Sequence, residues 1–257
     1  MLRFGKVVVT GLSAFAIASS PARGQDAIST DRPSFGAGSA IVSSGRVQVE
    51  SGYTLTSSEF VDVHTIGELL VRVGVVERLE LYLGFNSYVI ADGPTGSVDG
   101  IDDATAGIKV RLHDPPLAAP VGAPTVSALL TTRLPTGADE IGSSELQPEG
   151  RLLLDWAFED FGLGANLGIG FPSGGEDHFA QLFASLAVST SLADAVSGYL
   201  EYYTLQPASD GGSNAGFANV GLLFLVANDV QLDGRFGVGL NGTETDYFFG
   251  AGLAFRT

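Results

Sequence analysis

Residues 103–113, with the sequence DATAGIKVRLH, alternate between two kinds of side chain over their whole length. Ala104, Ile108 and Leu112 fall in one register of this alternation, and Lys109 and Arg111 fall in the other. Successive side chains of a β-strand point to opposite faces, so a period of two indicates a strand whose faces meet different surroundings. The stretch therefore predicts a strand with one apolar face and one polar face.

The same period recurs along the chain from residue 46 onward. The predicted strands are 46–56, 61–73, 79–89, 103–113, 125–134, 149–158, 161–171, 179–191, 196–205, 217–226, 230–240 and 246–256. Their typical length of about 11 residues is what a tilted strand needs to cross a bilayer. Connections are mostly short after even-numbered strands and longer after odd-numbered ones. We therefore expect an all-β fold: a closed, antiparallel transmembrane β-barrel of about 12 strands, with short periplasmic turns and longer extracellular loops.

A soluble β-sandwich or lectin domain would also alternate. Two features favour the membrane barrel. Charged residues within the predicted strands nearly all share one register, which leaves the other register nearly free of charge. Aromatic residues gather near the strand ends, as Trp156, Phe158 and Phe161 do around the turn at 159–160. An uncharged face bordered by aromatic rings suits lipid better than it suits two packed sheets.

The composition excludes several classes of function. There are 13 Lys and Arg against 29 Asp and Glu, a formal net charge of -16, which argues against a nucleic-acid partner. No cysteine is present, so disulfides and thiolate metal sites are excluded. No histidine-rich metal motif occurs either. We expect neither a metal nor a cofactor.

The first 24 residues have the pattern of a secretory signal peptide. Arg3 and Lys6 supply the positive start, 7–18 are mostly apolar, and Ala22 and Gly24 are the small residues of a cleavage site. The predicted organisation is a signal peptide at 1–24, a periplasmic N-terminal segment at 25–45 and a transmembrane β-barrel at 46–257. The expected location is the bacterial outer membrane, with its lipid, lipopolysaccharide, barrel-insertion machinery and a small-molecule solute as partners.

The polar register of the strands predicts the lining of the barrel. Its basic and acidic residues interleave, which fits cross-strand pairing or a ladder that guides a charged solute. Glycines in the interior register of 161–171 leave volume that faces aromatic rings, either as a slot for a flat apolar solute or as space that the rings fill. The predicted lumen-lining and solute-lining residues are Arg72, Tyr82, Tyr88, Lys109, Arg111, Arg133, Arg151, Tyr199, Tyr203 and Arg235.

Three functions are compatible with such a barrel. The first is a passive channel for small solutes. The second is a structural or adhesive barrel whose lumen is filled. The third, an outer-membrane lipid hydrolase, would need a Ser–His pair on the lipid-facing side. His64 and His113 fall in the interior register, His178 lies at a loop edge, and no G-x-S-x-G motif occurs. We therefore expect no catalytic residues and no enzyme activity.

Several motifs resemble a known family. They are TDRPSF at 30–35, GRVQVESGY at 45–53, ERLEL at 77–81, LPTG at 134–137, PASDGG at 207–212 and FGAGLAFR at 249–256. In this order they resemble the outer-membrane transporter family named for the MetA pathway of phenol degradation. The resemblance implies an outer-membrane β-barrel that passes small solutes, with aromatic or hydrophobic compounds as candidates. It implies no catalytic residues, since none defines the family.

Overall fold

The computed structural model describes residues 27–116, 122–172, 180–206 and 213–257, and the predicted signal peptide lies outside these ranges. Within them no helix is long and apolar enough to span a membrane. The described chain forms fourteen strands of one antiparallel sheet. They are β1 (Val47–Ser58), β2 (Asp62–Val76), β3 (Leu79–Phe85), β4 (Tyr88–Gly93), β5 (Gly96–Ile101), β6 (Ala104–His113), β7 (Thr125–Leu134), β8 (Gln147–Ala157), β9 (Gly162–Gly170), β10 (Gln181–Ala193), β11 (Val196–Leu205), β12 (Ala215–Ala227), β13 (Val230–Asn241) and β14 (Thr245–Arg256).

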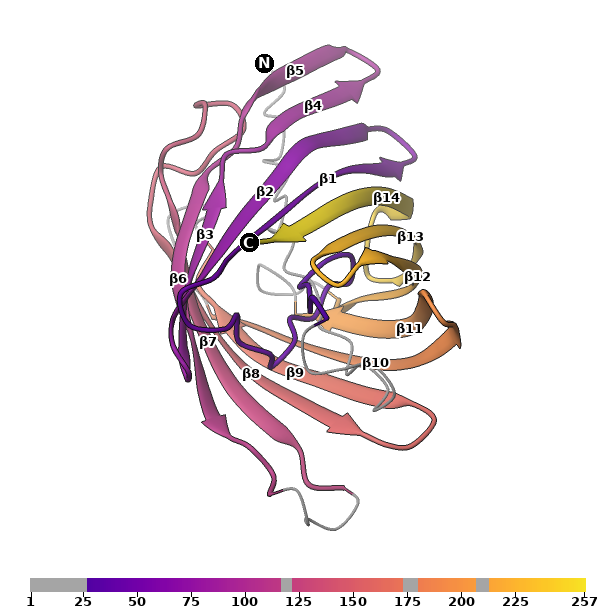
Figure 1. Cartoon of the computed structure of the whole chain (residues 1–257). Helices are drawn as coiled ribbons and strands as arrows, with labels where there is room; N and C mark the ends of the chain where they lie inside the picture. The colour runs from indigo at the N-terminus through magenta and orange to yellow at the C-terminus, as the bar shows by residue number, and fades with distance from the viewer. Residues whose placement is uncertain (1–26, 117–121, 173–179, 207–212) are drawn as a thin grey trace.

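The sheet closes on itself. Neighbouring strands pair in the order β1, β14, and then down through β13 to β6, followed by β3 and β2, and β2 pairs with β1 again. Figure 1 looks along the resulting barrel, with β1 beside β14. Twelve strands make the closed wall, and β4 and β5 are additional. The predicted closed antiparallel barrel of 12 strands is confirmed.

The two additional strands form a hairpin that extends the wall. The predicted strand 79–89 is interrupted at Asn86 and Ser87, which separate β3 from β4. β3 pairs with the second half of β2 and with β6, whereas β4 pairs with the first half of β2 and with β5. The connection predicted at 91–102 therefore contains a strand, β5, and the hairpin β4–β5 projects beyond β2 (Figure 1).

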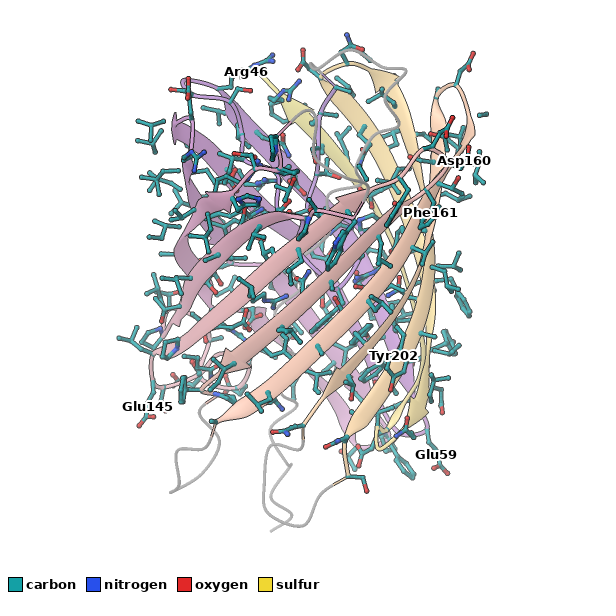
Figure 2. The ribbon with its side chains drawn as sticks, turned by 90° about the horizontal axis from the view of Figure 1, so that it is seen from below. Arg46, Glu59, Glu145, Asp160, Phe161 and Tyr202 are labelled. Carbon is teal, nitrogen blue, oxygen red and sulfur yellow. The ribbon has the colours of Figure 1, made fainter. Side chains whose placement is uncertain are left out.

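The barrel has two different ends. Figure 2 places Arg46 and Asp160 at one end, and Glu59 and Glu145 at the other. The first end, here called the short-turn end, holds the two-residue connections 77–78, 194–195 and 228–229. The second, the long-loop end, holds the connection 135–146 and the hairpin β4–β5. This is the unequal distribution of loops that the sequence predicts.

The wall is apolar outside and polar inside. Large apolar side chains such as Leu167 and Leu200 are 57% and 63% exposed, although they lie in the middle of their strands. Glu80 and Lys109, in contrast, are completely buried. A soluble domain has the opposite arrangement, because its apolar side chains are removed from water and its charges are left in it. The outer surface is therefore suited to a lipid environment.

A β-bulge in β2 changes which residues face inward. Gly67 and Glu68 have φ values of 99° and 33°, so the chain takes one extra step at this point. On the N-terminal side of the bulge, the odd-numbered Val63 and Thr65 are buried in the interior. On its C-terminal side, the even-numbered Arg72 is buried there. The interior register predicted for His64 is therefore wrong: its side chain lies on the outer face, where Nδ1 shares a hydrogen bond of 2.7 Å with the Tyr53 hydroxyl. Asp62, two residues earlier, shares this outward register.

The core of the molecule is the segment that precedes the wall. Residues 27–45, here called the N-terminal segment, pass through the interior of the barrel instead of lying beside it in the periplasm as expected (Figure 1). Asp31, Ser34 and Ala37 have no exposed surface. The physical reason is that the inward side chains of the wall carry many hydrogen-bond acceptors, and an irregular segment brings unpaired N–H groups to them.

Candidate functional site

The N-terminal segment forms a loop that enters and leaves by the short-turn end. The Ile28 N–H donates to the carbonyl of Asn228 in the turn between β12 and β13, at 2.6 Å. The Gly45 N–H donates to the carbonyl of Gly74 near the same end, at 2.8 Å. Between these points the chain reaches Phe35, which lines a cavity that opens toward the long-loop end. The segment thus occupies the short-turn half of the lumen.

Wall side chains bind the backbone of this segment. The Glu50 carboxylate accepts from the N–H groups of Asp31 and Arg32, at 3.0 and 2.9 Å. Glu201, on the far wall, accepts from Phe35 and Gly36, each at 2.8 Å. The remaining acceptors are Asn166 for Ala37, Asp155 for Ser39 and Glu80 for Val42. Hydrogen bonds to ionised acceptors are about twice as strong as neutral ones, so the wall fixes the segment in one position.

A buried cluster of charges joins the segment to β1, β2, β3 and β6. Lys109 donates to Asp31 at 2.9 Å, and Arg72 donates to Glu80 at 2.9 Å and to Glu50 at 3.2 Å. All five side chains are fully buried. Burial alone would raise the pKa of Asp31, but the positive charges of Arg72 and Lys109 outweigh it and hold the pKa below its ordinary value. Asp31 is therefore ionised and compensates both cations.

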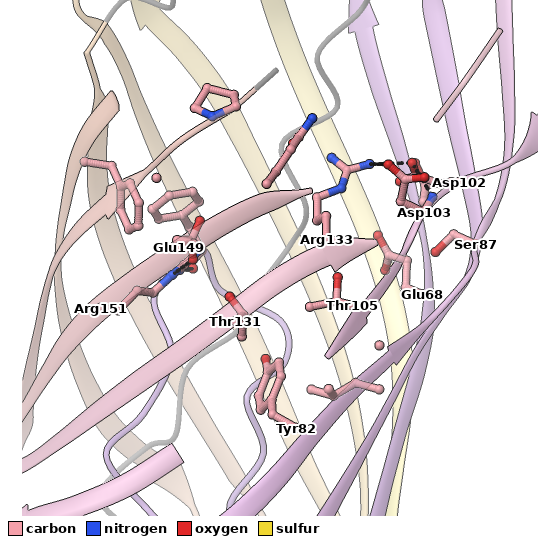
Figure 3. A pocket seen from close by; sticks show the side chains of 18 of the residues that line it. Glu68, Tyr82, Ser87, Asp102, Asp103, Thr105, Thr131, Arg133, Glu149 and Arg151 are labelled. Atoms are coloured by element: carbon pink, nitrogen blue, oxygen red, sulfur yellow. Dashed lines mark hydrogen bonds and ion pairs between the residues drawn. The ribbon is translucent and has the colours of Figure 1, made fainter. Parts of the chain in front are cut away.

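The long-loop half of the lumen contains a cavity. Its volume is about 160 Å³, and it opens to solvent. Its floor is the turn of the N-terminal segment at 32–35, and its walls come from β2, β3, β6, β7, β8, β10 and the ends of neighbouring strands. Figure 3 shows Arg151 on one side of this space and Glu68, Arg133 and Asp102 on the other, with Tyr82 between the two sides.

Aromatic rings and a guanidinium group make one wall of the cavity. Phe35 of the segment contacts Phe183 of β10 edge to face, with ring centroids 5.9 Å apart. The Arg151 guanidinium lies over both rings, 5.3 Å from the centroid of Phe35 and 4.6 Å from that of Phe183. Such contacts between a cation and a ring are favourable, and they hold the rings in place. The two rings are perpendicular to each other, the guanidinium group lies over both, and Tyr203 stacks on Phe35, so this wall is held rigidly but is not flat.

Polar groups make the opposite wall, and two of them have unused hydrogen-bonding capacity. The Glu68 carboxylate forms an ion pair with Arg32 through Oε2, but Oε1 is buried with no hydrogen-bond partner among the described residues. The Tyr82 hydroxyl, on a side chain that is 3% exposed, is likewise without a partner in the described chain. Unpaired buried polar atoms are uncommon in folded proteins.

The mouth of the cavity is tied to a long loop. Asp103 accepts from the N–H groups of Gly137 and Ser143, at 2.9 and 2.8 Å, and also from the Ser143 hydroxyl. Arg133 of β7 forms an ion pair with the neighbouring Asp102. These contacts hold the connection 135–146 against the wall. Part of the LPTG motif at 134–137 thus has a structural role at the rim.

The structure places the ten predicted lining residues in three environments. Tyr82, Arg133, Arg151 and Arg235 line the cavity. Arg72, Lys109, Arg111, Tyr199 and Tyr203 lie inside the barrel but outside the cavity lining, Arg72 and Lys109 in the charged cluster, Arg111 against the Ser39 carbonyl and Tyr203 stacked on Phe35.

Tyr88 is the exception. It lies on the outer face, 41% exposed, opposite the exposed Ile66 and Ile101 of neighbouring strands. The two residues of the break, Asn86 and Ser87, shift the register between β3 and β4, so the alternation cannot be continued through them. The predicted interior position of Tyr88 is therefore wrong.

Sequence reasoning left Glu68 out of the predicted solute-lining residues, and it did not predict that the N-terminal segment lies in the lumen. A signal for the segment was present in the motif TDRPSF at 30–35, which carries Asp31 and Arg32. Among the described residues no group of three or more His, Asp or Glu side chains could hold a metal ion. The cavity lining combines aromatic rings with hydrogen-bonding groups.

Comparison with known proteins identifies the fold and the family. No curated protein matches the sequence. An outer membrane channel from Pseudomonas putida F1 has 15% identity and a TM-score of 0.62, with 85% of this chain and 97% of that chain covered. The NanC porin has 13% identity and a TM-score of 0.54, with 81% of this chain and 98% of that chain covered. These likenesses show the fold of an outer-membrane β-barrel. The model of the family described as putative MetA-pathway of phenol degradation matches residues 30–257, which confirms the resemblance in the sequence, and the chain belongs to this family.

Proposed function

We propose that the protein is a channel of the bacterial outer membrane for the passive passage of small solutes, with aromatic or hydrophobic compounds as its preferred class. The observation that carries this proposal is the cavity of about 160 Å³, which opens to solvent and has Phe35 and Phe183 on one side. A cavity of about 150 Å³ can hold a molecule of the size of benzene. The rings of its wall favour contact with an aromatic or apolar solute over contact with a strongly hydrated one.

The exterior of the barrel and the named structural neighbours support the same proposal. The exposed apolar side chains on the outer face suit a bilayer, and both neighbours are described as a channel or a porin. The strand length and the unequal ends fit an outer-membrane barrel as well. Export of the chain by the predicted signal peptide at 1–24 would deliver it there.

In this proposal the N-terminal segment is the barrier of the channel. Any solute that leaves the cavity toward the short-turn end has to pass the turn at 32–35, which the wall holds by hydrogen bonds to Glu50 and Glu201. The segment would therefore limit the size and the rate of passage. A structural barrel with a filled lumen is the second candidate, because the same segment occupies half of the interior.

Liposome swelling with the full chain tests the two candidates against each other. The test solutes are phenyl β-glucoside and methyl β-glucoside, which are uncharged and differ in the ring. A channel of the proposed kind makes liposomes swell in both, and faster in phenyl β-glucoside than its larger size predicts. Folded protein that produces no swelling in either solute refutes the channel and supports the filled barrel. Swelling rates that differ only as the sizes of the two solutes predict would support the channel but refute its preference for aromatic solutes.

A further inference from the structure

We propose that the inner wall of the barrel contains a guanidinium-binding slot, which the chain's own Arg32 fills, and that this occupancy holds the N-terminal segment closed beneath the cavity. The slot lies between Gly52 of β1 and Gly252 of β14, which are paired with each other where the barrel closes. This inference rests on the proposed function, since it names the contact that regulates the barrier of the channel.

Two glycines make room for the guanidinium group. A Cβ added at Gly52 would clash with Cζ, Nη1 and Nη2 of Arg32, which are its three nearest atoms. A Cβ added at Gly252 would clash with Nε and Nη2 of the same side chain. Neither glycine has a positive φ, so the backbone conformation does not itself require glycine at these positions. The bare backbone therefore serves the close approach of Arg32.

Acceptor groups surround the slot. Glu68, which the bulge of β2 turns inward, forms an ion pair with Nη1 of Arg32. Asp233 of β13 lies 3.6 Å from Nε, and the carbonyl of Ala251 accepts from Nη2 at 3.3 Å. The side chains of the two acids are only 5% and 0% exposed. A planar group with donors along its edges fits this arrangement better than the compact ammonium group of a lysine does.

The segment is held less completely at Arg32 than one residue earlier. Asp31 accepts from Lys109 at 2.9 Å, and neither of its oxygens is left without a partner. Around the slot, both carboxylate oxygens of Asp233 and the Nε atoms of Arg32 and Arg235 are buried with no hydrogen-bond partner among the described residues. A polar network that is only partly satisfied stabilises a fold less than a complete one. Arg32 can therefore be released while Asp31 stays bound.

The accessibility of Ser34 tests this release. The chain contains no cysteine, so Ser34→Cys introduces a single thiol, at a side chain that is completely buried beside the cavity. The full chain with this change is placed in nanodiscs and treated with methyl methanethiosulfonate, and mass spectrometry measures the rate of modification. The added change Arg32→Ala should raise this rate about tenfold or more, the effect of losing hydrogen bonds between charged groups.

Guanidinium chloride should reverse the effect of Arg32→Ala. At concentrations far below those that unfold proteins, the ion should refill the empty slot and return the rate of modification toward that of the chain with Arg32. Urea is also planar and of similar size but carries no charge, so it should not slow the reaction. Sodium chloride at the same ionic strength is the control for screening of charges.

Gly52→Ala blocks the slot without removing a charge. Because the nearest atoms to the added carbon all belong to Arg32, this variant should raise the rate of modification in the chain with Arg32 and add nothing in the Arg32→Ala background. Gly234→Ala is the control, since its added carbon meets only a contact of 3.7 Å, and it should leave the rate unchanged. This pair of variants also serves if Arg32→Ala does not fold.

Two results would overturn the slot. The first is a rate of modification that stays low in folded Arg32→Ala and Gly52→Ala protein. The second is a rate in Arg32→Ala protein that guanidinium does not lower, or that urea lowers equally. Modification in nanodiscs requires no passage of a solute, so it can support the slot when liposomes fail to swell. Conversely, swelling with unchanged modification would leave the channel standing and refute the slot.

Discussion

The two halves of the lumen are lined by the same alternating strands but are filled in opposite ways. In the short-turn half, wall carboxylates such as Glu50 and Glu80 accept hydrogen bonds from backbone N–H groups of the N-terminal segment, which occupies the space between the strands. In the long-loop half, Glu68 and Glu149 pair with arginines and leave a cavity between them. An identical polar pattern in a strand thus gives a packed interior where a segment supplies N–H groups, and a binding space where it does not.

The largest effect is expected where the packed half loses its central cation. Arg72→Met removes the ion pairs to Glu50 and Glu80 and leaves both acids buried. Breaking a buried pair in this way costs about 3–5 kcal/mol of folding free energy. Urea titration, monitored by the faster gel migration of the folded barrel, should show a clearly lower midpoint.

Arg78→Met is the control for this loss. Arg78 lies at the same end, but its side chain is 61% exposed and its nearest pair, to Asp114, is 3.5 Å long. Exposed pairs contribute at most about 1 kcal/mol, so this variant should keep nearly the wild-type midpoint. Equal midpoints for both variants would contradict the idea that the buried cluster holds the packed half together.

A smaller effect is expected where the two halves meet. Glu201→Gln weakens the bonds from Phe35 and Gly36, which hold the tip of the segment under the cavity. Hydrogen bonds to a charged group contribute about 1.5–3 kcal/mol, so the open fraction of the channel should rise roughly tenfold or more. Single-channel recording in planar bilayers measures this. Glu244→Gln, at an exposed position of the long-loop end, should leave the open fraction unchanged.

The difference between the halves also explains what the sequence could predict. The alternation in 103–113 places Lys109 and Arg111 inside correctly, because a period of two survives wherever a strand is unbroken. It fails at His64 and Tyr88, because an irregularity of the backbone separates each of them from the rest of its predicted strand. For His64 this is the bulge at Gly67 and Glu68, and for Tyr88 it is the break between β3 and β4. Local sequence contains no clear sign of such an irregularity, apart from a glycine in one case.

The alternation of the strands could not predict that the N-terminal segment fills half of the lumen. The N-terminal segment has no alternation, so nothing in its period assigns it to the barrel. The interleaving of basic and acidic residues in the polar register fits pairing between strands. Several of the acids, among them Glu50, Glu80 and Glu201, instead accept from N–H groups of the segment. Every residue except proline has a backbone N–H donor, so the residue types of the sequence do not show which donors meet these acids.

The bulge that separates the halves of β2 gives a third prediction. Gly67→Ala puts a side chain on a residue with φ of 99°, where nothing lies within 4 Å of the added carbon, so the cost is purely conformational. It should destabilise the barrel by about 1 kcal/mol or more. Gly234→Ala is the control, because its added carbon meets only a contact of 3.7 Å and its φ is ordinary. Equal urea midpoints for the two variants would show that the bulge is unstrained.

The smallest effect is expected at the seam of the barrel, beyond the packed half. Asp229, in the turn between β12 and β13, accepts from Arg256 at 2.8 Å and from Arg46 at 3.0 Å, and so joins β14 to the start of β1. The hydrogen bond from Arg256, together with the charges of Arg256 and Arg46, lowers the pKa of Asp229 from its ordinary value of 3.8. Because the pKa of Asp229 is lower in the folded state, its ionised carboxylate stabilises the fold at any pH above the ordinary value of 3.8. This contribution is lost as the pH falls from 3.8 through the lowered pKa. Asp229→Asn should therefore lower the unfolding midpoint slightly near pH 7, and the gap to the wild type should narrow as the pH falls below 3.8. Asp160→Asn, in an exposed turn at the same end, should show no gap near pH 7. A gap for Asp229→Asn that persists in acid would mean that the turn is held by its shape and not by the ionised carboxylate.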